Sequence, residues 1–208
     1  MAEQEIEPLG KRRLCWPAPG DRLFTASGTP DDSFLGHSPF GNHGIMTAGY
    51  RGAADALVEK TREGSYEKDS LVFPIIFLYR QFIELELKGI IASYGRRCDV
   101  PPNWQSHRLD ELWKSVHRIM EYFEIEDVDG ANTAVGEVIR EFAAIDPNSF
   151  SFRYPVTRDG KPILYGDVKR VDLLRLKEVM EGVANLLSGT DCYIDDIERS
   201  GYFEQDER

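Results

Sequence analysis

The stretch LVFPIIFLYRQFIELELKGII, residues 71–91, constrains the fold of this chain more than any other part of the sequence. Arg80, Glu84 and Lys88 recur there at every fourth position, so a helix places them in one ionic stripe. Most of the other positions are large and apolar, which predicts a helix buried on nearly all sides within a bundle. Buried charge has to be paired or used, so a site is expected first along this stripe.

Two interpretations of the stripe stay open. In one, the side chains form ordinary ion pairs on a solvated face, each stabilising the helix by about 0.2–0.5 kcal/mol. In the other, they line a cleft, where Arg80 is suited to a two-point grasp of a phosphate or carboxylate. Apolar neighbours such as Phe77, Phe82 and Leu87 leave little room for a wet face.

Length and composition bound the class of protein. A chain of 208 residues with 41% hydrophobic and 29% charged residues suits one soluble domain with decorations. The formal net charge of -11 argues against a broad DNA-binding surface, although a small basic pocket is compatible with it. Cys15, Cys98 and Cys192 form no CxxC pair, which predicts a reducing, cytoplasmic setting. The charges within residues 71–91 would be costly in lipid, which predicts a core helix and no membrane anchor.

The pattern along the chain predicts a mainly α-helical protein, an antiparallel bundle of four to five helices. Residues 1–41 are rich in Pro, Gly, Asp and Ser and predict an irregular N-terminal arm, with a partly disordered tail as the alternative. We expect this arm to wrap the bundle through four aromatic side chains: Trp16, Phe24, Phe34 and Phe40. The bundle domain is expected over residues 42–189 and an acidic C-terminal tail over residues 190–208.

Helical periodicity and capping signals predict five helices, at residues 42–62, 70–94, 106–123, 130–145 and 167–187. In the first, a stripe with several small residues should face inward and allow close approach to a neighbour: Ile45, Gly49, Ala53, Ala56 and Leu57. In the third, six residues recur at core spacing: Leu109, Leu112, Trp113, Val116, Ile119 and Met120. Gly189 is expected to end the last helix.

Residues 150–166 change period and predict a short β-hairpin inserted into the bundle. Three aromatic residues alternate there, and the Asp159-Gly160 pair signals a tight turn. Arg153 lies between two of the aromatics and projects from the opposite face of the predicted strand. It points outward if the aromatics pack on the bundle, and inward if the hairpin lies across the mouth of a cleft. Lys161 follows the turn.

His107, Asp110 and Trp113 fall at the start of the third predicted helix. A histidine in this position can cap the helix or act as an acid or base near neutral pH. Antiparallel packing on the charged helix would place His107 nearer Lys88 than Arg80.

The candidate ligand-binding residues are Arg80, Glu84, Lys88, His107, Asp110, Arg153 and Lys161. Arg80 and His107 are also the candidates for catalysis. No metal site and no cofactor are predicted, because the remaining histidines show no ligand spacing and HExxH, P-loop, dinucleotide-loop and GxSxG motifs are absent.

At FLYRQFIELELKGII and SHRLDELW the chain resembles the HEPN-like helical domains of bacteria, the higher eukaryotes and prokaryotes nucleotide-binding superfamily. It is similar to an uncharacterised bacterial group that shares an FRYPxxxDGKP-like segment, present here as FRYPVTRDGKP. The resemblance covers residues 71–162 and implies an antiparallel helical bundle, a homodimer, and an association with RNA, nucleotides or antiphage and toxin systems. Catalytic members cut RNA without metal, using an Arg and a His at RxxxxH spacing. Here Leu85 stands five residues after Arg80, which departs from that pattern.

Three functions follow as hypotheses. The first is a catalytically degenerate HEPN-like protein that works by binding a second copy, a partner protein, or a small phosphorylated or RNA ligand. The second is a metal-independent endoribonuclease of a host-defence module, with Arg80 and Arg153 on the phosphate and His107 as acid or base. The third is a structural scaffold in which the charged stripe fixes the register of the helices.

Overall fold

The computed structural model describes residues 16–35, 38–64, 67–163 and 165–200. Cys15, His37, Leu164 and parts of the predicted arm and tail lie outside the described residues. The chain divides into two units, residues 1–36 and residues 37–208. In the first unit, residues 16–35 form local turns, such as the one in which Asp32 accepts from the backbone N–H of Ser27 and Gly28. Trp16, Phe24 and Phe34 are exposed there, and their packing against the bundle stays a prediction.

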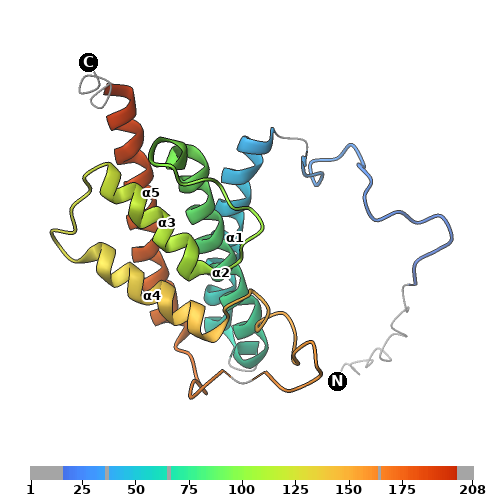
Figure 1. Ribbon diagram of the computed structural model, residues 1–208. Coiled ribbons are helices and arrows are strands. Elements are labelled where there is room, and N and C mark those ends of the chain that lie inside the picture. The colour runs from blue at the N-terminus through green and yellow to red at the C-terminus, as the bar shows by residue number, and fades with distance from the viewer. Residues whose placement is uncertain (1–15, 36–37, 65–66, 164, 201–208) are drawn as a thin grey trace, which may run out of the picture. The chain divides into compact units, whose positions relative to one another are not determined.

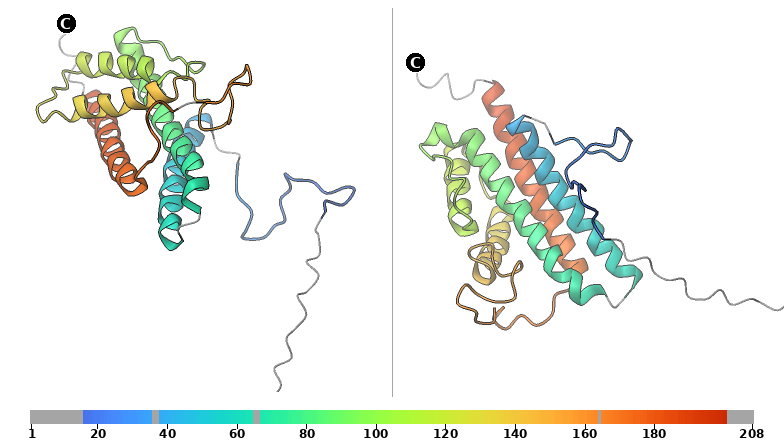
Figure 2. Two further views of the ribbon diagram at one scale, coloured as in Figure 1. Left: turned by 90° about the horizontal axis from the view of Figure 1, so that it is seen from below. Right: turned by 90° about the vertical axis from the view of Figure 1, so that its right-hand side faces the viewer.

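The second unit is mainly helical (Figure 1). Its five α-helices and one short 3-10 helix are α1 (Pro39–Glu63), α2 (Lys68–Tyr94), η2 (Gly95–Cys98), α3 (Leu109–Tyr122), α4 (Ala131–Ile145) and α5 (Leu173–Ser200). The long helices α1, α2 and α5 lie side by side, with the shorter pair α3 and α4 next to them (Figure 2). None of the helices in the described part is both long enough and apolar enough to cross a membrane.

The helix α2 is the centre of the core and contacts α1, α3 and α5. Its residues are buried on nearly all sides, as the apolar run predicts, and Arg80, Glu84 and Lys88 are buried with them. All six predicted core residues of α3 are buried as well. The helix begins at Leu109, three residues later than expected, so His107 precedes it.

The inward face predicted for α1 is wrong at Ile45, Gly49, Ala53 and Ala56, whereas Leu57 is half-buried and packs against the core as predicted. Ala54, Val58 and Thr61 are buried instead, while a line of mostly small residues faces out: Gly44, Ile45, Ala48, Gly49, Gly52, Ala53 and Ala56. We call these seven residues the α1 outer stripe. Ile45 in this row is 53% exposed, and the adjacent Met46 is 50% exposed.

The β-hairpin predicted at residues 150–166 is wrong. The described part of this segment contains one isolated bridge, Val156 to Pro162, around a turn in which the Gly160 N–H donates to Thr157 O. The alternating aromatic residues stack on one another and do not form a strand. Phe150 stacks on Tyr154, and Phe152 stacks on Tyr165.

The predicted end of the last helix is also wrong. The helix α5 begins at Leu173 and continues through Gly189 to Ser200, so residues 190–200 of the acidic segment are helical. Burial of Leu187, Thr190 and Ile194 explains the extension, because this face packs on the rest of the unit beyond the glycine.

Candidate functional site

Arg80 lies in the middle of α2 and is 0% exposed. Each nitrogen of its guanidinium donates to a protein oxygen. Nε donates to Asp146 O at 3.2 Å, Nη1 to Glu84 Oε2 at 3.0 Å, and Nη2 to His107 O at 2.7 Å. Since these acceptors lie on α2, before α3 and at the end of α4, Arg80 fastens α2 to both shorter helices.

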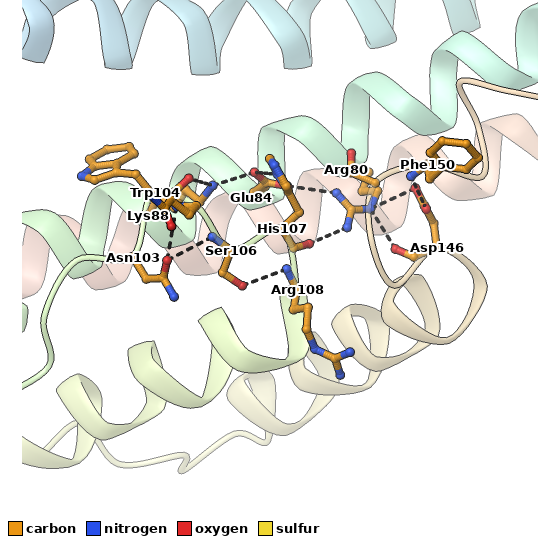
Figure 3. A network of polar contacts seen from close by, with 12 residues as sticks. Arg80, Glu84, Lys88, Asn103, Trp104, Ser106, His107, Arg108, Asp146 and Phe150 are labelled. Atoms are coloured by element: carbon orange, nitrogen blue, oxygen red, sulfur yellow. Dashed lines mark hydrogen bonds and ion pairs between the residues drawn. The ribbon is translucent and has the colours of Figure 1, made fainter. Parts of the chain in front are cut away.

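Arg80, Glu84, Lys88, His107 and Asp146 form one ionic cluster. Glu84 is the common acceptor within this cluster. Its Oε1 accepts from Lys88 Nζ and from His107 Nδ1, both at 2.8 Å, while Oε2 accepts from Arg80. An ionised carboxylate only accepts, so the His107 proton lies on Nδ1. Figure 3 shows Lys88, Glu84 and Arg80 in a row along α2, with His107 reaching the row from the chain before α3.

Lys88 connects α2 to the loop that precedes α3. Its Nζ donates to Trp104 O at 3.0 Å as well as to Glu84. The loop is shaped by Asn103, whose Oδ1 accepts from the backbone N–H of Ser106 at 3.0 Å. The ionic stripe therefore holds both Trp104 and His107 in place.

Asp146 belongs to the cluster and was missed from the sequence. It caps the C-terminal end of α4 and is fully buried. Its Oδ1 accepts from the backbone N–H of Phe150 at 2.6 Å and of Ser151 at 2.9 Å, and its Oδ2 lies 3.2 Å from Arg80 Nε. The sequence did contain one indication of this role, because Asp146 stands directly before Pro147 at a predicted helix end. An Asp in this position commonly accepts hydrogen bonds from backbone N–H groups of the turn that follows.

The buried charges of the cluster balance. Two cations, Arg80 and Lys88, face two carboxylates, Glu84 and Asp146. Burial by itself raises the pKa of Glu84, but hydrogen bonds from Lys88 and His107 outweigh burial and hold the pKa below its ordinary value. Burial also lowers the pKa of Arg80 against the opposing charges of Asp146 and Glu84, and a guanidinium still stays protonated.

The lowered pKa of Glu84 predicts acid sensitivity. The unfolded chain binds the proton of this carboxyl more readily than the folded chain, so stability falls as the pH drops from about 4.5 through the folded pKa. We expect Glu84→Gln to show a flatter loss of stability than the wild type between about pH 5 and pH 3. Urea unfolding at a series of pH values measures both slopes, and parallel slopes would contradict the prediction.

Arg153 lies beside the cluster and not within it. Its guanidinium carbon is 5.8 Å from the ring centre of Phe77 on α2 and 5.8 Å from that of Tyr154, and its Nε donates to Ser149 O. Its charge lowers the pKa of Arg80 a little further, so the two cations are close. Across the described residues, no carboxylate forms an ion pair with Arg153.

Asp110 and Lys161 are not brought to the cluster. Asp110 pairs with Arg108 at 2.8 Å at the start of α3, and Lys161 lies in the exposed turn after Gly160. Within the described residues there is also no group of three or more His, Cys, Asp and Glu side chains that could hold a metal ion.

The cluster is therefore an internal clamp. Arg80 is out of reach of solvent, Glu84 accepts from three donors, and Lys88 has two acceptors. Only the His107 side chain, 54% exposed, extends to the surface. Such an arrangement fixes the relative positions of α2, α3 and α4, and it leaves no room for a phosphate at the Arg80 guanidinium.

In the comparisons with known proteins, no family model, no curated protein and no solved structure matched the chain.

Proposed function

We propose that this chain is a non-catalytic helical interaction protein that binds a second copy of itself through the α1 outer stripe. The observation that carries the proposal is the orientation of α1. Its small and apolar residues recur at helical spacing as a core stripe does, yet they face outward. A row of this kind is suited to burial against another helix.

The residue composition of the α1 outer stripe favours another helix as its binding partner. At Gly44, Gly49 and Gly52 an added Cβ would meet no atom within 4 Å, so the surface of α1 is open along its length. Small residues let two helix backbones approach closely, which increases the contact area per residue. Because the stripe is apolar and lies along one helix, it can pair with itself about a two-fold axis.

Two polar contacts hold α1 to α2 and α5. The Tyr79 hydroxyl of α2 donates to Asp55 Oδ1 at 2.6 Å, and Lys177 of α5 pairs with Glu59 at 2.6 Å. These contacts fix the rotation of α1, so the outer stripe is presented as a rigid surface. Rigid presentation reduces the entropy lost on association.

The same proposal assigns the ionic cluster a structural role. A HEPN-like antiparallel bundle, working as a homodimer in a bacterial defence or toxin system, is the setting that the sequence resemblance implies. A ribonuclease would need its Arg and His at a phosphate, whereas Arg80 is buried and paired at all three nitrogens. A phosphorylated or RNA ligand would instead have to bind at Arg153 and the exposed edge of His107.

Replacing Gly49 by Gln tests the association directly. We expect the wild type to dimerise and Gly49→Gln to weaken the dimer by at least about tenfold, because the longer side chain separates the two helices. Sedimentation equilibrium of the full chain gives both dissociation constants.

Gly182→Gln is the matched control. Gly182 is also an exposed helical glycine with open space around it, but it lies on α5. Both substitutions raise helix propensity, so neither should impair folding. A wild type that is monomeric at every concentration, or equal dimer constants for the two variants, would overturn the proposal.

A further inference from the structure

The loop between α4 and α5, residues 146–172, contains a basic segment in an otherwise acidic chain. Residues 153–171 hold five cationic side chains and two carboxylates, whereas the whole chain has a net charge of -11. The cations are Arg153, Arg158, Lys161, Lys169 and Arg170. All five are exposed, and none of them forms an ion pair with another described residue. Figure 1 shows the loop in orange, outside the helices of its unit.

Apolar side chains are exposed among these cations. Five of them lie on the loop and at the start of α5, and each is between 36% and 50% exposed: Tyr154, Val156, Val168, Val171 and Leu174. Single exposed apolar residues are common on protein surfaces, but a group of them rimmed by charge marks an interaction surface. The loop therefore presents positive charge and apolar groups together.

The loop is folded around its own aromatic residues. The ring centres of Phe150 and Tyr154 are 4.5 Å apart, and those of Phe152 and Tyr165 are 5.2 Å apart. The Tyr165 hydroxyl also donates to Ser151 O at 2.8 Å. These contacts hold the described part of the loop in one conformation, which reduces the entropy lost when its outer side chains meet a partner.

The same contacts decide between the classes of anionic partner. Proteins that bind single-stranded nucleic acid stack the bases on free aromatic rings. Here all four rings of the loop are stacked in pairs, and the exposed aliphatic side chains offer no ring. Exposed aliphatic groups among Lys and Arg are instead the pattern of a surface that contacts an anionic membrane.

We infer that the α4–α5 loop binds the surface of an anionic lipid bilayer. The five cations interact with the phosphate and carboxylate groups of the lipid heads, and the exposed apolar side chains enter the boundary between heads and acyl chains. At about 0.1 M salt, charges more than roughly 10 Å away are largely screened. The acidic remainder of the chain is therefore screened from the lipid, and the loop in contact with it determines binding.

Co-sedimentation of the full chain with lipid vesicles tests this inference. We expect saturable binding to vesicles of phosphatidylcholine and phosphatidylserine, a decrease as salt is raised, and no binding to phosphatidylcholine alone. The triple variant Arg158→Gln/Lys161→Gln/Arg170→Gln should lower the partition coefficient by about tenfold or more. These side chains are exposed and form no hydrogen bond within the described part of the chain, so the variant keeps its fold.

The matched control is Arg96→Gln/Lys114→Gln/Arg118→Gln. It makes the same change in net charge with exposed residues of η2 and α3 that have no ion pair among the described residues. It should bind within about twofold of the wild type, because these charges lie outside the loop.

Val168→Gln/Val171→Gln tests the apolar part of the contact and should lower the partition coefficient by about threefold or more. The inference is overturned if the wild type does not bind vesicles that contain phosphatidylserine, or binds phosphatidylcholine alone equally well. Equal losses in the two triple variants, or unchanged binding of the valine variant, would overturn it too. Single-stranded RNA that binds the wild type at the same salt more tightly than the vesicles do would assign the loop to nucleic acid instead.

Discussion

Replacing Glu84 by Leu is expected to lower the free energy of unfolding by about 3–5 kcal/mol. The substitution removes the one side chain that accepts from Arg80, Lys88 and His107, all within 3.0 Å. Arg80 and Lys88 would then stay buried with an excess of positive charge, and an uncompensated buried charge is among the most costly defects in a folded protein. Urea unfolding followed by far-ultraviolet circular dichroism measures the change.

An exposed pair with the same spacing serves as the control. Asp195 and Arg199 on α5 are four residues apart, as Glu84 and Lys88 are on α2, and form an ion pair of 2.7 Å, but their side chains are 42% and 75% exposed. Asp195→Leu should therefore change stability by no more than about 1 kcal/mol. Losses of similar size in the two variants would mean that burial of the cluster is not what makes Glu84 important.

Replacing both members of the central pair should recover much of this loss. We expect Arg80→Met/Glu84→Leu to be about 1–3 kcal/mol more stable than Glu84→Leu, because one buried cation, Lys88, is then balanced by one buried carboxylate, Asp146, and apolar side chains fill the space. Lys88 keeps the carbonyl of Trp104, and Asp146 keeps the N–H groups of Phe150 and Ser151. The measurement is a double-mutant cycle in urea with Arg80→Met as the fourth species. Additive losses would contradict a direct coupling between the two side chains.

The sequence was most informative where one pattern allowed one structure. The helix at residues 71–91 is apolar at most positions, so the burial of its apolar residues followed from the sequence, whereas the burial of its charged stripe stayed open; the core of α3 followed from a clean helical period. The sequence predicted that His107 lies near the charged helix, but it did not predict the hydrogen bond between His107 and Glu84. This hydrogen bond depends on a loop conformation set by Asn103 and on the carbonyl of Trp104, and no sequence period encodes either.

The sequence was misleading where one pattern allowed two structures. The stripe of α1 has the spacing of a core face, and an apolar face has the same spacing whether its partner lies within the chain or outside it. The alternating aromatics of residues 150–154 have the spacing of a strand, and stacking across a turn gives the same spacing. Gly189 resembles a helix end, but packing of Thr190 and Ile194 outweighs the cost of about 1 kcal/mol for a glycine inside a helix.

Sedimentation equilibrium of the folded Arg80→Met/Glu84→Leu variant tests most directly whether the ionic cluster only supports the interaction surface. If the ionic cluster has only a structural role and the α1 outer stripe forms the dimer contact, the variant dimerises with a dissociation constant within about threefold of the wild type. A variant that keeps its helical circular dichroism and thermal transition but is monomeric would contradict the account, because the buried charges would then be part of the function themselves.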